Sequence, residues 1–312
     1  MFSTLAVVLP VFALIFAGWA ARRAGVFGPN ASTELNRFVV WLALPALLFD
    51  VVANARWSEI WRPGFVAVFG LSVSLVFAAT VALRLRRSGP LADAAIDGLN
   101  AGYGNVAYIG FPLMLAALGP ESATPTLIAT LITVCVLFAV AVVLIEIGLQ
   151  SEAHPGRLAA KVGAALIRNP IVVGAALGVL VQLSGFGVPA PVERVLKLLG
   201  GAASPCALVA LGLFLGAERE APRSDVRSAS MLVGLKLILQ PALAWALATA
   251  FHLPGPLTHA AVLLAAMPTG TGPFMLAEFY RREAGLTSTV VLTSTVISVA
   301  TISAYLAWAT LG

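Results

Sequence analysis

Charged residues are scarce in this sequence. Asp, Glu, Lys and Arg make up only 11% of its 312 residues, whereas 60% are hydrophobic; globular domains carry roughly 25% charged residues. The mean hydropathy is +0.96. A water-soluble fold of this length does not need so much apolar surface, so the composition excludes that class. It predicts an all-α polytopic membrane protein, since a spanning helix hydrogen-bonds its backbone internally and needs about 20 apolar residues.

Cysteine and histidine are also scarce. The two cysteines, Cys135 and Cys206, lie inside apolar runs, which favours packing over a disulfide or a metal pair. The three histidines lie near expected loops, and no two share a face and depth with other metal-ligating types. We therefore expect no metal site, no catalytic cluster and no cofactor. The motif G-x-x-x-x-G-K-[ST] is absent, which argues against ATP-driven transport by this chain.

The basic balance does not indicate nucleic-acid binding. The formal charge is +5 and the pI about 9.7, but the basic residues form short clusters between apolar runs, as loop charges do in membrane proteins. The start of the chain has no basic n-region, and its first apolar run ends at Arg22 and Arg23 without a small-residue cleavage site. We expect this run to be a retained span rather than a signal peptide.

Ten apolar runs bounded by charged and turn residues predict ten spans. The runs cover residues 4–21, 33–53, 64–83, 92–118, 123–147, 169–183, 192–215, 228–251, 257–280 and 287–311. A polar segment at 150–161 and a charged loop at 218–227 interrupt them.

Lys and Arg distribution predicts the orientation. With the N-terminus outside, fourteen basic residues fall in or beside inside loops and only four outside, and such a bias sets topology in short loops. Both termini should then face away from the cytoplasm. The inside set is Arg22, Arg23, Arg37, Arg84, Arg86, Arg87, Arg157, Lys161, Arg168, Arg219, Arg223, Arg227, Arg281 and Arg282, and the outside set is Arg56, Arg62, Arg194 and Lys197.

An internal repeat relates the two halves. A shift of 160 residues aligns Pro10 with Pro170 and Pro45 with Pro205, and a shift of 166 aligns Gly104 with Gly270. Each unit contains five spans, so the second enters the membrane upside down, as in many secondary transporters. We expect a first repeat at 1–149, a cytoplasmic linker at 150–167 and an inverted second repeat at 168–312.

Two spans are interrupted at matching positions of this repeat. The fourth contains GYGNVAYIGFP at 102–112 and the ninth contains MPTGTGPF at 267–274. Gly and Pro weaken helices, and a break survives at membrane depth only where it lines protein or water. Half-helix N-termini then present N–H groups to an anion. The expected binding residues are Tyr103, Gly104, Asn105, Tyr108, Pro112, Pro268, Thr269, Gly270 and Thr271.

These motifs resemble those of the auxin efflux carrier family. The resemblance covers essentially the whole chain and includes Asn169-Pro170 at the sixth span and LTSTVV at 286–291. The family includes plant auxin exporters and bacterial carriers for malate, malonate and similar carboxylates. Its likeness to bile-acid-sodium symporters implies crossed broken helices 4 and 9. It also implies a scaffold of spans 1, 2, 6 and 7, a moving domain of spans 3–5 and 8–10 working as an elevator, and a homodimer formed through the scaffold.

The chain departs from the plant pattern in two respects. Gly104 stands where the plant proteins have a proline directly before the asparagine, and the long cytoplasmic loop of many plant members is absent. These departures indicate a compact bacterial-type carrier of the inner membrane, rather than a dedicated auxin exporter.

Ionisable residues inside apolar runs are costly and mark candidate sites. Lys236, within the eighth span, either neutralises an anionic substrate or reaches the interface. Glu278 and Asp50 are the candidates for coupling to a proton or sodium ion, each with a solvated span end as the alternative. Asp93 and Asp97 are explained by the dipole at the start of a helix.

The leading interpretation is a non-enzymatic secondary or potential-driven carrier of a small organic anion. The alternatives are a sodium- or proton-coupled carrier of another solute, or a membrane receptor that uses the same pocket. A sodium–proton antiporter requires an acidic pair beside the breaks, and the sequence places none there.

Overall fold

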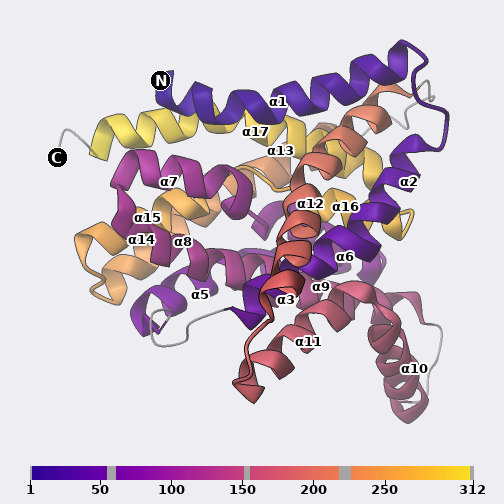
Figure 1. Cartoon of the computed structure of the whole chain (residues 1–312). Coiled ribbons are helices and arrows are strands. Elements are labelled where there is room, and N and C mark those ends of the chain that lie inside the picture. Colours follow the sequence, from indigo (N-terminus) through magenta and orange to yellow (C-terminus); the bar gives the residue numbers. More distant parts are fainter. Residues whose placement is uncertain (1, 55–60, 151–154, 218–225, 310–312) are drawn as a thin grey trace.

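The computed structural model describes residues 2–54, 61–150, 155–217 and 226–309, which form helices joined by short connections (Figure 1). Within these ranges the only β pairing is one isolated bridge. Six helices are long and apolar enough to cross a membrane, and a bent pair gives a seventh candidate. The all-α, multi-pass membrane class predicted from composition is thereby confirmed. The expected spans at 4–21, 92–118 and 257–280 are not among the six, and the last two are interrupted; the expected span at 169–183 belongs to the bent pair.

The first half of the chain runs from α1 to α9. Three π-helical segments, η1, η2 and η4, continue α-helices with a locally wider turn, and η3 is a short 3₁₀ turn. The elements are α1 (Phe2–Arg23), α2 (Ala31–Phe38), η1 (Val39–Ala43), α3 (Leu44–Ala53), α5 (Pro63–Arg86), α6 (Leu91–Gly102), η2 (Val106–Gly110), α7 (Phe111–Leu118), η3 (Pro120–Ser122), α8 (Ala123–Thr130), η4 (Leu131–Leu137) and α9 (Phe138–Leu149).

The second half runs from α10 to α17 and contains one π-helical segment, η5. Its elements are α10 (Pro155–Arg168), α11 (Pro170–Ser184), α12 (Ala190–Gly216), α13 (Val226–Gly234), η5 (Leu235–Leu239), α14 (Gln240–Ala250), α15 (Gly255–Ala265), α16 (Gly272–Phe279) and α17 (Ala284–Ala309).

Glycines let α1 pack backbone to backbone on α12. A Cβ atom on Gly212 would stand 2.0 Å from the carbonyl oxygen of Ile15, and one on Gly18 would stand 2.3 Å from that of Val209. Gly212 and Gly216 form a G-x-x-x-G pair, the small-residue spacing that permits close helix contact in membranes. Since lipid offers no hydrophobic drive for association, this contact depends on close van der Waals packing.

The contact between α3 and α11 uses the same device. Gly174 and Gly178 face Pro45 and Phe49, where added Cβ atoms would stand 2.6 Å and 2.9 Å from the respective carbonyl oxygens. Before α11, residues 159–168 of α10 form an angle of 79° with it, and Asn169 caps α11 by accepting from the Ile171 amide at 3.0 Å. The stretch expected as a linker at 150–167 thus contains most of helix α10. This helix is amphipathic, with apolar and basic residues on different faces.

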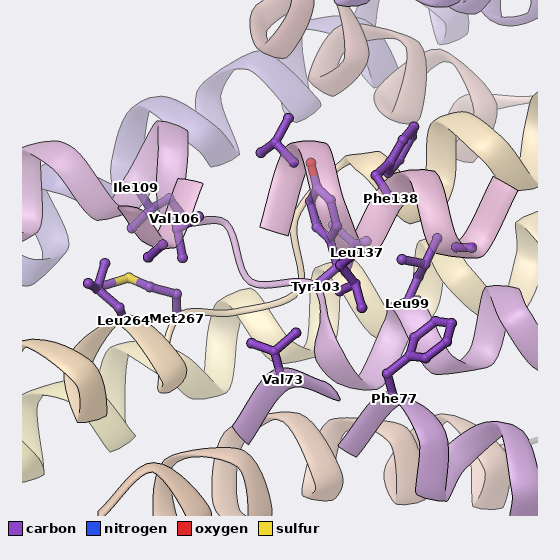
Figure 2. Packing of buried hydrophobic residues seen from close by; sticks show 14 of the residues in the cluster. Val73, Phe77, Leu99, Tyr103, Val106, Ile109, Leu137, Phe138, Leu264 and Met267 are labelled. Carbon is purple, nitrogen blue, oxygen red and sulfur yellow. The ribbon is translucent and has the colours of Figure 1, made fainter. Parts of the chain in front are cut away.

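The main buried core lies where α5, α6 and α9 meet α15 and α16. Every residue of α6 from Ala92 to Gly102 is buried, and α15 and α16 are nearly as enclosed. Figure 2 shows Phe77 and Leu99 in this core, with Tyr103 beside Phe138; the ring centroids of Tyr103 and Phe138 are 5.8 Å apart. The half-helices α6, α15 and α16 therefore lie in the protein interior, whereas Leu115 on α7 is exposed.

Candidate functional site

The first break separates α6 from η2. Helix α6 ends at Gly102, Tyr103 has an extended backbone with φ −85° and ψ 97°, and helical turns resume at Val106. The sequence around this point contains Gly102 and Gly104, which weaken helix continuation. The predicted interruption of the fourth span is confirmed, and it spans Tyr103 to Asn105.

The second break separates α15 from α16. Helix α15 ends at Ala265 and α16 begins at Gly272, with Thr271 at the N-cap position. Pro268 and Gly270 lie between them, and proline lacks the amide that would continue the helix. This interruption of the ninth span was also predicted.

The two breaks pair with each other through their backbones. The Asn105 amide donates to the Pro268 carbonyl at 2.8 Å, and the Gly270 amide donates to the Tyr103 carbonyl at 3.0 Å. Gly104 and Thr269 form the antiparallel bridge between these bonds. Figure 2 shows the two irregular segments passing beside Tyr103 and Met267. We refer to residues 103–105 and 268–271 as the crossing.

Two polar side chains at the crossing are not used by the fold. Asn105 and Thr271 are the N-cap residues of η2 and α16, and neither forms a side-chain capping bond. Both are buried, at 8% and 7% exposure, and within the described residues neither side chain has a hydrogen-bond partner. Since N-cap side chains normally accept from the first helical turn, these two groups and the nearby first-turn amides are available to a ligand.

Thr269 has a structural part instead. Its hydroxyl donates to the Asn100 carbonyl at 2.8 Å, and its amide donates to the Ser294 hydroxyl at 3.1 Å. The sequence reasoning did not include Ser294 or Asn100. The sequence did contain one signal for Ser294, a polar residue inside the apolar run expected as the last span.

Lys236 brings a positive charge to the crossing from η5. Its ammonium is fully buried and donates to Gln240 Oε1 and to the Ala265 carbonyl, each at 2.6 Å. Gln240 Nε2 in turn lies 3.4 Å from the Gly102 carbonyl. One lysine and one glutamine therefore contact the last carbonyls of both first half-helices, which carry the negative ends of the helix dipoles. Gln240 was absent from the sequence prediction.

Gly104 leaves room for this lysine. A Cβ atom at position 104 would stand 3.4 Å from Lys236 Nζ and 3.4 Å from Val106 Cγ1. On the other segment, Cβ atoms at Gly270 and Gly272 would come within 2.8 Å and 2.6 Å of the Tyr103 ring. Glycines on both segments thus allow a large ring and an ammonium to approach the paired backbones.

The remaining predicted site residues lie elsewhere or are not described. Asp50 is on α3, where its side chain accepts from Asn54 Nδ2 at 2.8 Å. Glu278 is in the last turn of α16, past the crossing. Tyr108 and Pro112 belong to η2 and α7, and their side chains fall outside the part that the structure describes.

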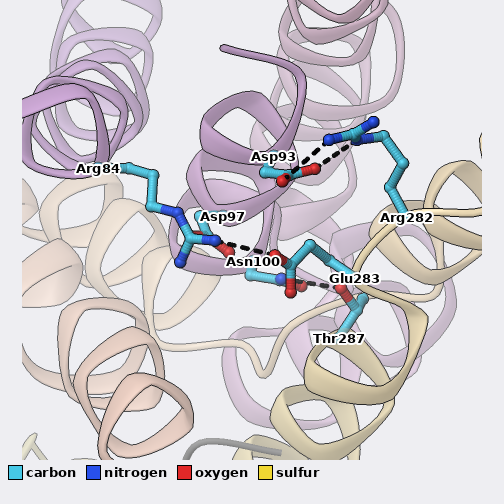
Figure 3. A network of polar contacts seen from close by, with 7 residues as sticks. All are labelled: Arg84, Asp93, Asp97, Asn100, Arg282, Glu283 and Thr287. Atoms are coloured by element: carbon cyan, nitrogen blue, oxygen red, sulfur yellow. Dashed lines mark hydrogen bonds and ion pairs between the residues drawn. The ribbon is translucent and has the colours of Figure 1, made fainter. Parts of the chain in front are cut away.

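A network of ion pairs surrounds the start of α6 (Figure 3). Arg282 donates to both oxygens of Asp93 at 2.5 and 3.1 Å, and Arg84 lies 3.3 Å from Asp97 and 2.9 Å from Glu283. The hydrogen bond to Asp93 raises the pKa of Arg282, which lies in the connection before α17. The helix-dipole explanation for Asp93 and Asp97 missed these partners, because Arg282 and Glu283 come from a distant part of the sequence and Arg84 comes from the preceding helix.

Comparison with known proteins identifies relatives along nearly the whole chain. A family model described as "Membrane transport protein" matches residues 3–306. A Rhizobium meliloti protein named "Putative malonate transporter" is 32% identical over 96% of this chain and 93% of its own length. An "Uncharacterized transporter" of Methanothermobacter thermautotrophicus is 26% identical over 93% of each chain.

A plant relative matches a shorter stretch. "Auxin efflux carrier component 3a" of Oryza sativa subsp. japonica is 31% identical over 131 residues, which are 41% of this chain and 21% of that protein. Each of these relatives is named as a transporter or carrier. From the family match and the relatives together, the chain belongs to the auxin efflux carrier family of membrane transport proteins.

Proposed function

We propose that this protein carries a small organic anion, with a malonate-like carboxylate as the first candidate substrate. The observation that carries the proposal is the buried ammonium of Lys236 beside the crossing. Among the described residues no carboxylate forms an ion pair with it, and its two hydrogen bonds go to neutral oxygens. A fully buried charge without a counter-charge is costly, so an anion bound there would lower the energy of the site.

The groups around Lys236 suit a carboxylate. Asn105 and Thr271 offer uncommitted polar side chains, and η2 and α16 begin at the crossing, although Pro273 in the first turn of α16 has no amide to donate. Hydrogen bonds from amides, an amide side chain and an ammonium to a carboxylate are stronger than neutral ones. The relative named as a malonate transporter favours a dicarboxylate. If the substrate is a dicarboxylate, its first carboxylate binds at Asn105 and Thr271, and its second carboxylate pairs with Lys236.

We further propose ten spans in two inverted repeats that move as an elevator. The pairing of equivalent breaks from the two halves supports the repeat. The glycine-packed contacts of α1 with α12 and of α3 with α11 suit a rigid scaffold built from spans 1, 2, 6 and 7. We also propose that the protein forms a homodimer through this scaffold. We place it in the bacterial inner membrane, with both termini outside the cytoplasm. Discontinuous helices at a repeat interface are typical of binding sites in such carriers.

Reconstitution into proteoliposomes tests this function. Radiolabelled malonate should accumulate or exchange across the membrane, and unlabelled malonate and malate should compete. A thermal-shift screen of mono- and dicarboxylates, with and without sodium and at two pH values, would rank ligands independently of transport. Tight binding without any exchange would favour the receptor alternative, whereas stabilisation by cationic or neutral solutes alone would contradict an anion site.

A further inference from the structure

Helix α6 carries two buried oxygen atoms that have no hydrogen-bond partner among the residues that the structure describes. They are Asp97 Oδ1 and Asn100 Oδ1, one helical turn apart. Asp97 is 4% exposed and Asn100 is fully buried. An unsatisfied carboxylate oxygen in such a place costs free energy. Buried polar atoms of this kind indicate that a ligand, a water or a proton belongs beside them.

Asp97 shares its nearest guanidinium group, that of Arg84, with a second carboxylate. Arg84 lies 3.3 Å from Asp97 Oδ2, but its other terminal nitrogen lies closer to Glu283, at 2.9 Å. Arg282 is engaged by Asp93. The two guanidinium groups thus face three carboxylates, as Figure 3 shows, and Arg84 is shared between Asp97 and Glu283.

A cavity gives water a place beside the carboxyl group. It measures about 320 Å³ and is lined by Asp97 and Arg84 together with Thr80, Ser228 and the exposed Arg87. One water needs only about 10–15 Å³ of such space. A proton donor can therefore reach the wall that holds Asp97, and Arg87 is the one further charged residue on that wall.

Helix α6 links Asp97 to the crossing. Asn100, one turn further along, accepts the Thr269 hydroxyl at 2.8 Å through its carbonyl and donates its side-chain amide to Thr287 at 3.0 Å. The helix then ends at Gly102, directly before the first break. Helix α6 thereby connects the ion pair of Arg84 and Asp97 with the residue that contacts Thr269.

We propose that Asp97 binds a proton that this protein carries together with its organic anion. This inference rests on the proposed function. In the step, a hydronium ion in the cavity transfers its proton to the Asp97 carboxylate, an O–H bond forms and water is released. The carboxyl group becomes neutral, and Arg84 remains paired with Glu283. Co-transport of a proton reduces the charge moved with the anion, and each net charge moved against the potential costs about 2.3 kcal/mol per 100 mV.

Infrared difference spectroscopy of the purified protein tests the proton site without any transport. The difference between spectra recorded at acidic and alkaline pH should contain a protonated-carboxyl band. This band should be missing in Asp97→Asn and present in Asp97→Glu. The control is Glu34→Gln, which removes an exposed carboxylate paired with Arg37 and should keep the band. If the parent protein lacks the band, or if the band survives in Asp97→Asn, the proposal is overturned.

Proteoliposomes test the coupling. If one proton is carried per anion, a pH that is one unit lower outside than inside should raise malonate accumulation by up to about tenfold. The reason is that one pH unit is a tenfold ratio of proton concentrations. Asp97→Asn should lose this response and still exchange labelled for unlabelled malonate; Glu34→Gln should keep both. A parent protein that transports malonate with no response to the gradient overturns the proton coupling and leaves the carrier function intact. Failure of all carboxylate transport rejects the proposed function, while the infrared result still decides whether Asp97 takes up a proton.

Discussion

The amide of Asn105 donates to the carbonyl of Pro268 at 2.8 Å, and this bond joins the two helix breaks through their main chains. The reciprocal bond from Gly270 to Tyr103 completes the pairing. Because backbone atoms hold the crossing together, its uncommitted side chains can be changed with little effect on the fold. Substitutions there therefore report on binding.

Asn105→Ala and Thr271→Ala should each weaken anion binding while leaving folding intact. Loss of one hydrogen bond to a charged group costs about 1.5–3 kcal/mol, which corresponds to at least about a tenfold loss of affinity. Malonate titration by thermal shift and proteoliposome uptake both measure this loss. Thr301→Ala, on α17 with its hydroxyl bonded to the Ser298 carbonyl, serves as the control. Parent-like transport by Asn105→Ala would remove the crossing from consideration as the binding site.

Lys236→Gln should be more damaging to binding than either of those changes. Removing one partner of a buried charge pair costs about 2–5 kcal/mol, and the affinity for malonate should fall by at least about twentyfold. Lys236→Arg should not restore it, because the larger planar guanidinium would have to fit where the Lys236 side chain is already fully buried. The matched control is Lys197→Gln, whose ammonium pairs with Glu193 and is 59% exposed. Unchanged affinity in Lys236→Gln would show that the lysine only caps α15.

Gly212→Ala should destabilise the contact between α1 and α12. Its Cβ atom would stand 2.0 Å from a backbone carbonyl that cannot rotate away, and overpacking of this kind costs about 1–3 kcal/mol or more. Gly201→Ala on the same helix meets nothing within 4 Å and should instead stabilise the helix by about 0.5–1 kcal/mol. Thermal unfolding in detergent should separate the two in opposite directions. Equal melting temperatures would contradict the close packing of α1 on α12.

Arg282→Gln should lower stability by about 1–3 kcal/mol. This value lies between those of an exposed pair and a buried one, since the Arg282 side chain is 31% exposed and that of Asp93 is 12% exposed. Arg37→Gln removes an exposed ion pair, with exposures of 54% and 62%, and should change stability by less than about 1 kcal/mol. Thermal unfolding of both variants at neutral pH checks the difference. A loss no larger in Arg282→Gln than in Arg37→Gln would place the pair among ordinary surface contacts.

The sequence alone was enough for the membrane class and for both helix breaks. Scarce charge and long apolar runs require lipid as the solvent, and the Gly and Pro residues around Gly104 and Pro268 act locally on the backbone. These are properties of composition and of near neighbours in the chain, so they can be read without coordinates. The family resemblance rested on these two local motifs together with Asn169-Pro170 and residues 286–291.

Tertiary structure decided what surrounds the breaks. Lys236 appeared in the sequence as an ion that either binds an anion or reaches the interface, and only folding placed it between Gln240 and the end of α15. Asp97 appeared as a helix-start residue, whereas in the fold Arg84, at the end of the preceding helix, lies between it and Glu283 from the connection before α17. Burial and ion pairing depend on which distant segments meet, and no local pattern contains that information.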